Sequence, residues 1–208
     1  IKNSGMEIEN VSRETFSELN YYTQSILRKN KNINLISKTT ENSINTRHIL
    51  DSAQIIDFID KKDINTCTDL GSGAGLPGIV ISILMKERNK LFKMIFYEKS
   101  FHKSNFLKDV AKKLNLNAEI NQKNIFEQKN LKTDVIVSRA FKPVSVIFEI
   151  AFTNFIKCKY IILFLGKTGK EILNEAKRKW NFNYEEKKSL TSDGSLVIKI
   201  SNLKKKNG

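Results

Sequence analysis

Ten residues decide the fold of this chain: Asp69-Leu70-Gly71-Ser72-Gly73-Ala74-Gly75-Leu76-Pro77-Gly78. Residues 66–70 have the β-branched and apolar composition of a short buried strand, and the apolar residues after Pro77 recur at helical spacing. Pro77 suits a first helical turn, where its missing N–H costs no hydrogen bond. The glycines allow positive φ and a close approach of the backbone to a ligand at the helix start. The stretch therefore predicts a strand, a cofactor-binding loop and a helix.

Two classes of cofactor fit such a loop, because residues 73–78 also match G-x-G-x-x-G, a weak dinucleotide signal when it stands alone. Asp69 argues against a pyrophosphate, since a carboxylate near the helix start repels phosphates and attracts a cation such as S-adenosylmethionine. The next expected strand, 93–97, ends in Glu98, where a doubly wound fold places a carboxylate on ribose hydroxyls. We therefore favour a methyltransferase over an NAD-dependent dehydrogenase, and over a purely structural turn. Gly71, Gly73 and Gly75 are the loop positions expected to contact the cofactor.

The remaining segments alternate between strand and helix, as in a parallel sheet covered on both faces. We expect strands at 66–70, 93–97, 118–121, 134–138 and 160–165, and helices at about 101–114, 144–156 and 171–180. Two N-terminal helices are expected to precede them, one capped by Ser12 and one over about 41–60.

Two short strands, 184–190 and 195–201, close the chain around the turn-forming residues 191–194. A terminal antiparallel hairpin on a mostly parallel sheet is typical of the α/β, Rossmann-like, seven-stranded class I methyltransferases, by analogy of fold. We predict a helical cap at 1–63, packed on a single compact methyltransferase domain at 64–208.

The chain carries 36 Lys plus Arg against 22 Asp plus Glu, a formal net charge of +14. This excess favours a polyanionic partner, and a methyl-donor loop on a basic chain points to nucleic acid as substrate. No run of about eighteen apolar residues and no leader pattern occurs, so we expect a cytoplasmic protein without a membrane span. Cys67 and Cys158 lack metal or redox spacing, which predicts free thiols and no bound metal.

Four motifs follow one another in the chain: Asn34-Leu35, Arg47-His48-Ile49-Leu50-Asp51-Ser52, the loop 69–78, and Ser138-Arg139-Ala140-Phe141. In this order they resemble the motifs of the bacterial GidB/RsmG family, the small-subunit ribosomal RNA guanine-N7 methyltransferases. The resemblance covers almost the whole chain and is far more specific than a general Rossmann match. It implies that the protein binds S-adenosylmethionine, releases S-adenosylhomocysteine, and methylates a guanine in the region of position 527 of 16S rRNA. The implied partner is this rRNA or the small ribosomal subunit, bound by a monomer.

The resemblance also implies which residues form the cofactor site. The family's contacts fall on Gly71, Leu76, Asn124, Ile125 and Arg139, and Glu98 is similar to its ribose carboxylate. Asn124 and the backbone of Ile125 are a plausible pair for an adenine ring, with one oxygen to accept and one N–H to donate. Two positions depart from the family pattern: Phe164-Leu165-Gly166 stands where most members have Leu-Lys-Gly, and Gly194-Ser195 replaces a basic residue.

Residues expected to face RNA are Arg47, His48, Phe141, Lys167, Lys170 and Lys199. Phe141 could stack on an extruded base, although a hydrophobic cap on the sheet is the alternative. Arg139 is the candidate for a functional cation, paired with a carboxylate or phosphate, or else a structural ion pair at a strand end. Since N7 methylation removes no proton, we interpret His48 as a helix residue beside Arg47 and Asp51, whose i, i+4 spacing permits a surface ion pair.

The expected chemistry needs no catalytic base. Exocyclic-amine and C5 methylation use an Asn-Pro-Pro-Tyr type motif or a Pro-Cys nucleophile, and this chain has neither. Guanine N7 carries an exposed lone pair and no proton, so proximity and in-line orientation could supply most of the acceleration. Three alternatives remain. The enzyme could methylate a sugar oxygen of RNA, or it could use S-adenosylmethionine to methylate a small or protein substrate. The chain could also be a basic RNA-binding module with a vestigial loop.

Overall fold

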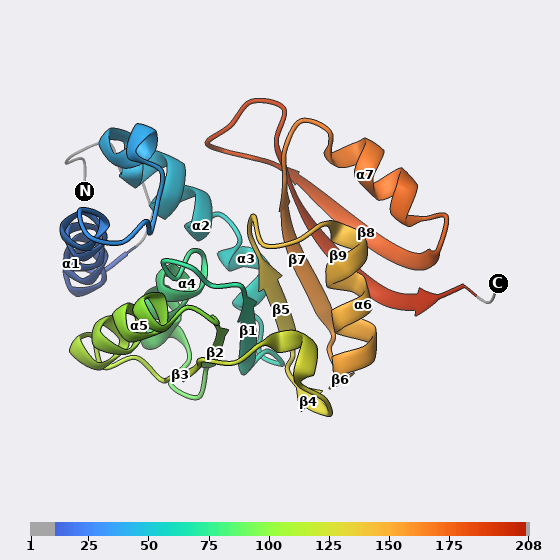
Figure 1. Ribbon diagram of the computed structural model, residues 1–208, viewed down its shortest axis with the longest axis horizontal. Coiled ribbons are helices and arrows are strands. Elements are labelled where there is room, and N and C mark those ends of the chain that lie inside the picture. The colour runs from blue at the N-terminus through green and yellow to red at the C-terminus, as the bar shows by residue number, and fades with distance from the viewer. Residues whose placement is uncertain (1–10, 207–208) are drawn as a thin grey trace.

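The computed structural model describes residues 11–206 and contains a seven-stranded sheet in the order β3-β2-β1-β5-β7-β9-β8 (Figure 1). Its strands are β1 (Thr66–Leu70), β2 (Lys93–Tyr97), β3 (Ala118–Asn121), β5 (Val135–Ser138), β7 (Tyr160–Leu165), β8 (Trp180–Lys188) and β9 (Leu196–Lys205). The first five strands pair in parallel, and β9 runs antiparallel between β7 and β8. This is the predicted class I methyltransferase sheet with its terminal hairpin.

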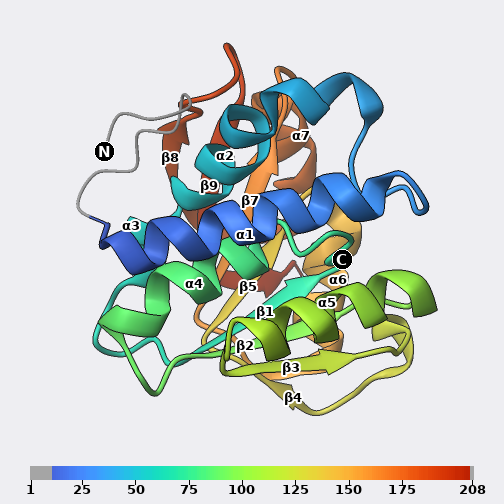
Figure 2. The same ribbon diagram turned by 90° about the vertical axis from the view of Figure 1, so that its left-hand side faces the viewer.

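Helices cover both faces of the sheet because its central strands are apolar on both sides. In β7, Ile161, Leu163 and Leu165 join one buried cluster and Ile162 joins the other. The first cluster includes side chains of α6 (Val144–Asn154) and α7 (Gly169–Ala176). The second includes side chains of α1 (Arg13–Asn30), α4 (Gly78–Arg88) and α5 (Phe101–Lys113). Figure 2 shows α1 lying on the side of the sheet that holds the second cluster, against α4.

The N-terminal segment differs from the prediction in one respect. Ser12 caps α1 as expected, its Oγ accepting from the Thr15 N–H at 3.0 Å. The single helix expected over 41–60 is wrong, because the chain there is a 3₁₀-helix η1 (Lys38–Ser43), a π-helix η2 (Asn45–Leu50) and two short α-helices, α2 (Asp51–Ala53) and α3 (Ile56–Ile59). Hydroxyls of Thr40 and Ser43 bond to backbone carbonyls within this segment, and such bonds compete with regular helix. The spacing of apolar residues over 41–60 indicated which face of the segment is buried, but it did not indicate the type of helix.

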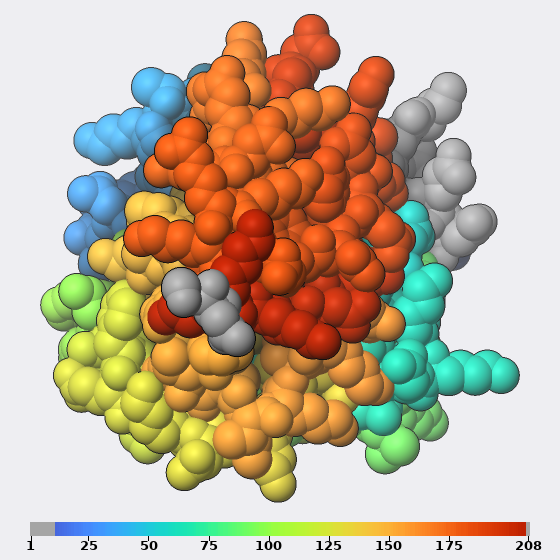
Figure 3. All heavy atoms as spheres, turned by 90° about the vertical axis from the view of Figure 1, so that its right-hand side faces the viewer, coloured from blue at the N-terminus to red at the C-terminus, as the bar shows by residue number. Residues whose placement is uncertain are grey.

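Pro77 stands at the start of α4 as expected, as its N-cap. Several other boundaries differ from the prediction. The hairpin strands expected at 184–190 and 195–201 are β8 (Trp180–Lys188) and β9 (Leu196–Lys205). The helix expected to 156 ends at Asn154, and β6 (Phe155–Lys157) pairs with β4 (Leu131–Lys132) in a small second sheet. The helix expected at 171–180 ends at Ala176, because the buried Trp180 ring opens β8 and packs edge-on against Phe148. Figure 3 shows the face that α7, β8 and β9 form, in orange and red.

Cys67 is buried in β1, Cys158 is half-buried before β7, and both are free thiols. Within residues 11–206, no helix is long and apolar enough to cross a membrane. The same residues contain no group of three or more His, Cys, Asp or Glu side chains placed to hold a metal ion.

Candidate cofactor site

The glycine loop crosses the carboxyl end of β1 and is held there by backbone hydrogen bonds. The Gly71 and Ser72 N–H groups both donate to the Tyr97 carbonyl at the end of β2, at 2.9 and 3.2 Å. Gly71, Gly73 and Gly75 have φ of 68°, 57° and 93°. These left-handed values favour glycine, so the prediction of a glycine-dependent turn is confirmed.

Asp69 stabilises the loop from the side that faces away from the cavity. It is 1% exposed and does not line the adjacent cavity, and one carboxylate oxygen accepts from the Gly78 N–H at 2.9 Å. This bond satisfies a free donor at the start of α4. Burial raises the pKa of Asp69 to about 7, against the lowering effect of the Gly78 N–H. The structure therefore assigns Asp69 to positioning the loop, where we had expected direct attraction of a cationic ligand.

Glu98 connects the loop to the following helix. Its two carboxylate oxygens accept from the N–H groups of Gly73 and Ser100, each at 2.8 Å. Ser100 is the N-cap of α5, so Glu98 fixes the loop relative to that helix. A carboxylate oxygen has more than one acceptor site, and Glu98 lines the cavity, so it retains capacity to accept from ligand hydroxyls.

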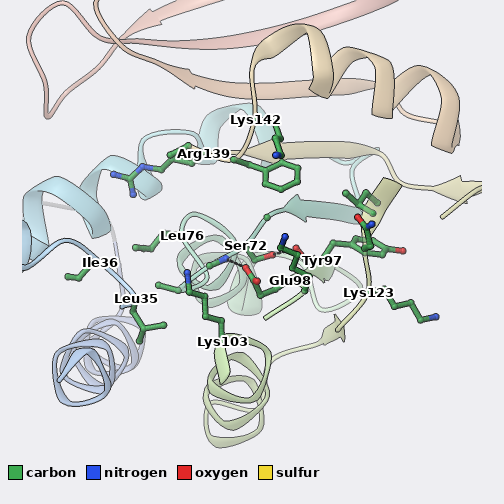
Figure 4. Close-up of a pocket in the computed structure, with 18 of the residues that line it drawn as sticks. Leu35, Ile36, Ser72, Leu76, Tyr97, Glu98, Lys103, Lys123, Arg139 and Lys142 are labelled. Carbon is green, nitrogen blue, oxygen red and sulfur yellow. Dashed lines mark hydrogen bonds between the residues drawn. The ribbon is translucent and has the colours of Figure 1, made fainter. Parts of the chain in front are cut away.

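A cavity of about 620 Å³ lies at the carboxyl edge of the parallel strands (Figure 4). Its volume is within the range of small-molecule sites, and open α/β sheets bind ligands at this edge. The predicted residues that line it are Gly71, Gly73, Leu76, Glu98, Asn124, Ile125, Arg139, His48 and Phe141. Asp69 and Gly75 do not, and Gly75 packs against Ile79 and Leu107 behind the loop.

Asn124 and Ile125 form one wall of the cavity, beyond β3. Asn124 is the N-cap of the 3₁₀-helix η3 (Ile125–Glu127), where its Oδ1 accepts from the Phe126 N–H at 3.3 Å and its amide donates to Glu127 at 2.8 Å. The buried Ile125 side chain presents an apolar surface there. The pair is thus placed as expected, with the Asn124 side chain already engaged in the cap.

Arg139 joins the cavity to the N-terminal segment. Its guanidinium lies 3.1 Å from an Asp51 carboxylate oxygen and donates to the Arg47 carbonyl at 2.7 Å. A second guanidinium nitrogen lies 3.2 Å from Nδ1 of His48. The expected Arg47–Asp51 surface pair is therefore wrong, because Asp51 is buried against Arg139 and Arg47 is exposed. Both interpretations of Arg139 have support, since it is an ion-paired residue on the cavity wall.

Asp51 also connects this junction to the C-terminal hairpin. Its other carboxylate oxygen accepts from the Thr191 hydroxyl at 2.6 Å and from the Gln54 amide at 2.8 Å. The Gln54 carbonyl oxygen in turn accepts from the Leu190 N–H at 3.0 Å. The π-helix η2 presents the Arg47 carbonyl to Arg139, and π-helical turns occur frequently at functional sites.

His48 is expected to be neutral at physiological pH. Burial and the nearby Arg139 and Arg47 cations lower its pKa to about 4. With Nδ1 accepting from Arg139, Nε2 donates to the Thr40 hydroxyl at 2.8 Å. The neutral His48 ring thus lies between the Arg139 guanidinium and the Thr40 hydroxyl.

This depressed pKa predicts a pH-dependent contribution to stability. Between pH 6.5 and 4 the unfolded chain binds a proton at His48 and the folded chain does not, so acidification destabilises the wild type. The His48→Gln variant has no imidazole to protonate, so it lacks this pH-dependent loss of stability. We expect the stability of the wild type relative to the variant to fall by roughly 1 to 2 kcal/mol over this window, after allowance for solvent screening of a half-buried group. Urea unfolding of both proteins at several pH values measures it, and a constant difference would contradict the assignment.

Two aromatic side chains, Phe141 and Tyr22, contact the glycine loop. Nothing in the sequence indicated this role for Tyr22. A Cβ on Gly71 would collide with the Phe141 ring, so this ring covers the loop, next to the cavity. Tyr22, on α1, is fully buried and donates from its hydroxyl to the Ala74 carbonyl at 2.8 Å. In the sequence Tyr22 was one member of an apolar helix stripe, and only the fold shows its polar end at the loop.

The three lysines expected to face RNA lie away from the cavity lining. Lys199 bonds Glu185 at 2.9 Å, has 13% of its side chain exposed, and lies over the Tyr160 ring at 4.4 Å. That expectation is not supported for Lys199, because its charge is already paired within the sheet. Lys170 is exposed but lies 3.5 Å from Glu186. Lys167 is exposed, beside Gly194.

Comparison with known proteins decides the family. The GidB family model, described as rRNA small subunit methyltransferase G, matches residues 15–197. The chain belongs to the GidB family. Ribosomal RNA small subunit methyltransferase G of Pelagibacter ubique is 46% identical over 201 residues, covering 96% of this chain and 94% of that protein. The protein of the same name from Rickettsia rickettsii (strain Sheila Smith) is 35% identical over 195 residues, covering 94% and 98%.

Solved structures share the fold of this GidB-family chain at low identity. The 16S rRNA methylase RmtB superposes with a TM-score of 0.54 at 8% identity, covering 92% of this chain and 75% of that one. M. capricolum TrmK, in complex with S-adenosylhomocysteine, has a TM-score of 0.54 at 16% identity, covering 72% of this chain and 66% of that one. These likenesses show the methyltransferase fold.

Proposed function

We propose that this protein transfers a methyl group from S-adenosylmethionine to N7 of a guanine in 16S rRNA of the small ribosomal subunit. The observation that carries the proposal is the family match over residues 15–197, with the family's motif residues meeting around one cavity. We further propose that the protein acts in the cytoplasm as a monomer.

The residues around the cavity fit S-adenosylmethionine. A Cβ at Gly73 would lie 3.9 Å from its nearest neighbour, so this glycine leaves open space at the cavity wall. Glu98 has acceptor capacity for ribose hydroxyls, and the Ile125 wall suits an adenine ring. Arg139 can face the methionine carboxylate from the opposite wall. Bound S-adenosylmethionine would supply an activated methyl group, whose bond to sulfur breaks as the bond to guanine N7 forms.

The protein's own contribution is orientation. N7 of guanine is an acceptor that carries no proton, so no side chain has to remove one. His48 also lines the cavity, and its lowered pKa favours the neutral ring beside Arg139. Hydrogen bonds from or to Tyr22, Asp69 and Glu98 fix the glycine loop. The loop can thus hold the methyl donor in place while the guanine enters the cavity. Such positioning can supply a large part of the rate acceleration.

The proposal is tested by methyl transfer from labelled S-adenosylmethionine to naked 16S rRNA, to partial particles and to complete small subunits, followed by mapping of the modified atom. We expect label on guanine N7 with at least one of these substrates, and calorimetric binding of S-adenosylmethionine without binding of NAD. A methyl group mapped to another atom would overturn the acceptor assignment, and tight binding of NAD would overturn the class of enzyme.

A further inference from the structure

Four lysines line the same cavity without taking part in any contact described so far: Lys99, Lys103, Lys123 and Lys142. Lys99 follows β2, Lys103 lies in the first turn of α5, Lys123 precedes η3 and Lys142 precedes α6. Figure 4 shows Lys103, Lys123 and Lys142 around the cavity. We call these four residues the rim lysines. They are separated in sequence, and only the sheet brings them together.

The rim lysines have no ion pair and no side-chain hydrogen bond within residues 11–206. Glu98 is the single carboxylate in the cavity lining, and it is engaged by two backbone N–H groups. Arg139 adds a fifth cation, which Asp51 neutralises. With Glu98 still an anion and Arg139 paired with Asp51, the cavity lining has an excess of three positive charges.

Neither the methyl donor nor the fold accounts for this charge. S-adenosylmethionine has two cationic groups and one carboxylate, so an uncompensated cluster of lysines repels it overall. Lys103 lies in the first turn of α5, where the helix dipole disfavours a cation and no acidic residue is present. This excess of positive charge suits a ligand that is strongly anionic and reaches the mouth of the cavity from solvent.

We propose that the rim lysines bind the phosphates of the acceptor RNA strand on both sides of the base that enters the cavity. This inference rests on the proposed function and assigns its RNA-binding surface to residues nearer the cavity than Lys167, Lys170 and Lys199. Lysine contacts to phosphates position a strand without reading its sequence. They also raise the local concentration of a polyanion at the mouth of the cavity.

The test replaces all four rim lysines by glutamine: Lys99→Gln, Lys103→Gln, Lys123→Gln and Lys142→Gln in one protein. The matched control carries Lys90→Gln, Lys108→Gln, Lys112→Gln and Lys113→Gln, which removes the same charge from exposed lysines that have no ion pair within residues 11–206. The probe is a 16S rRNA fragment whose affinity is measured at several salt concentrations. S-adenosylmethionine affinity and thermal unfolding are measured on the same proteins.

We expect the rim variant to bind the fragment at least tenfold more weakly than the control does. The slope of log affinity against log salt should become shallower by roughly 3, since each single-strand phosphate contributes about 0.7. Affinity for S-adenosylmethionine should be retained or increased. Equal losses in the rim and control variants would overturn the inference, and so would a large loss of S-adenosylmethionine affinity in the rim variant.

The outcome is distinguishable from failure of the proposed function. A wild-type protein that binds the fragment through the rim lysines but transfers no methyl group to guanine N7 would contradict the proposed reaction and support this surface. A wild-type protein that methylates guanine N7, with a rim variant that binds and methylates RNA as the control does, would support the reaction and contradict the surface.

Discussion

Gly73→Val is expected to abolish binding of S-adenosylmethionine, with a loss of affinity of more than about 100-fold. Gly73 has a φ of 57°, a left-handed value that valine rarely adopts, and its Cα faces open space at the cavity wall. The new side chain would therefore fill part of the ligand's volume. It would also strain the loop at a cost of about 1 to 3 kcal/mol.

Two further substitutions separate these effects. Gly73→Ala carries backbone strain with little occlusion, because its Cβ would lie 3.9 Å from the nearest heavy atom, the Gly71 carbonyl oxygen. Gly166→Val places the same bulky side chain where a Cβ meets nothing within 4 Å, after β7. We expect calorimetry to show an intermediate loss for Gly73→Ala and none for Gly166→Val. A folded Gly73→Val protein with wild-type affinity would remove the loop from the cofactor site.

Much of the sheet could be predicted because its strands are buried on both faces and read as short apolar runs between turn residues. Residues 66–70, 93–97, 118–121 and 160–165 are strands with the expected limits. The glycine loop was also predictable, since the left-handed positions are occupied by glycines. The segment 41–60 and the α7–β8 boundary were less predictable. Apolar spacing does not distinguish 3₁₀-, π- and α-helical turns, and Trp180 is buried at the start of β8.

The site could be predicted only where its signal is local in sequence. The loop and Glu98 follow from strand ends, whereas Asn124 and Ile125 rested on the family resemblance. The partner of Asp51 could not be predicted, since Arg47 stands at the ideal helical spacing while Arg139 approaches from a distant strand. The rim lysines were missed for the same physical reason, because each belongs to a different loop or helix of an edge that exists only in the folded sheet.

Arg139→Ala is expected to reduce both stability and methyl transfer. The substitution removes a guanidinium with 20% of its side chain exposed and leaves the Asp51 carboxylate, 11% exposed, without its ion-pair partner. Breaking a fully buried pair costs about 3 to 5 kcal/mol, so for this partly exposed pair we expect roughly 2 to 3 kcal/mol. If the guanidinium also holds the methionine carboxylate or an RNA phosphate, the variant loses a further ten- to hundredfold or slightly more in rate, as expected of a charge-assisted contact worth about 1.5 to 3 kcal/mol.

Asp51→Asn distinguishes the two roles of Arg139. This variant breaks the same ion pair, keeps the guanidinium at the cavity, and leaves an amide that can still contact Thr191 and Gln54. Arg139→Lys should rescue only part of the activity, because an ammonium cannot reproduce the planar contacts to Asp51 and to the Arg47 carbonyl. Thermal unfolding and single-turnover methylation, well below the lowest melting temperature, are measured on all three variants. A functional Arg139 predicts far slower transfer in Arg139→Ala than in Asp51→Asn at similar stability. Equal rates in these two variants would make Arg139 a structural residue that ties the N-terminal segment to the sheet.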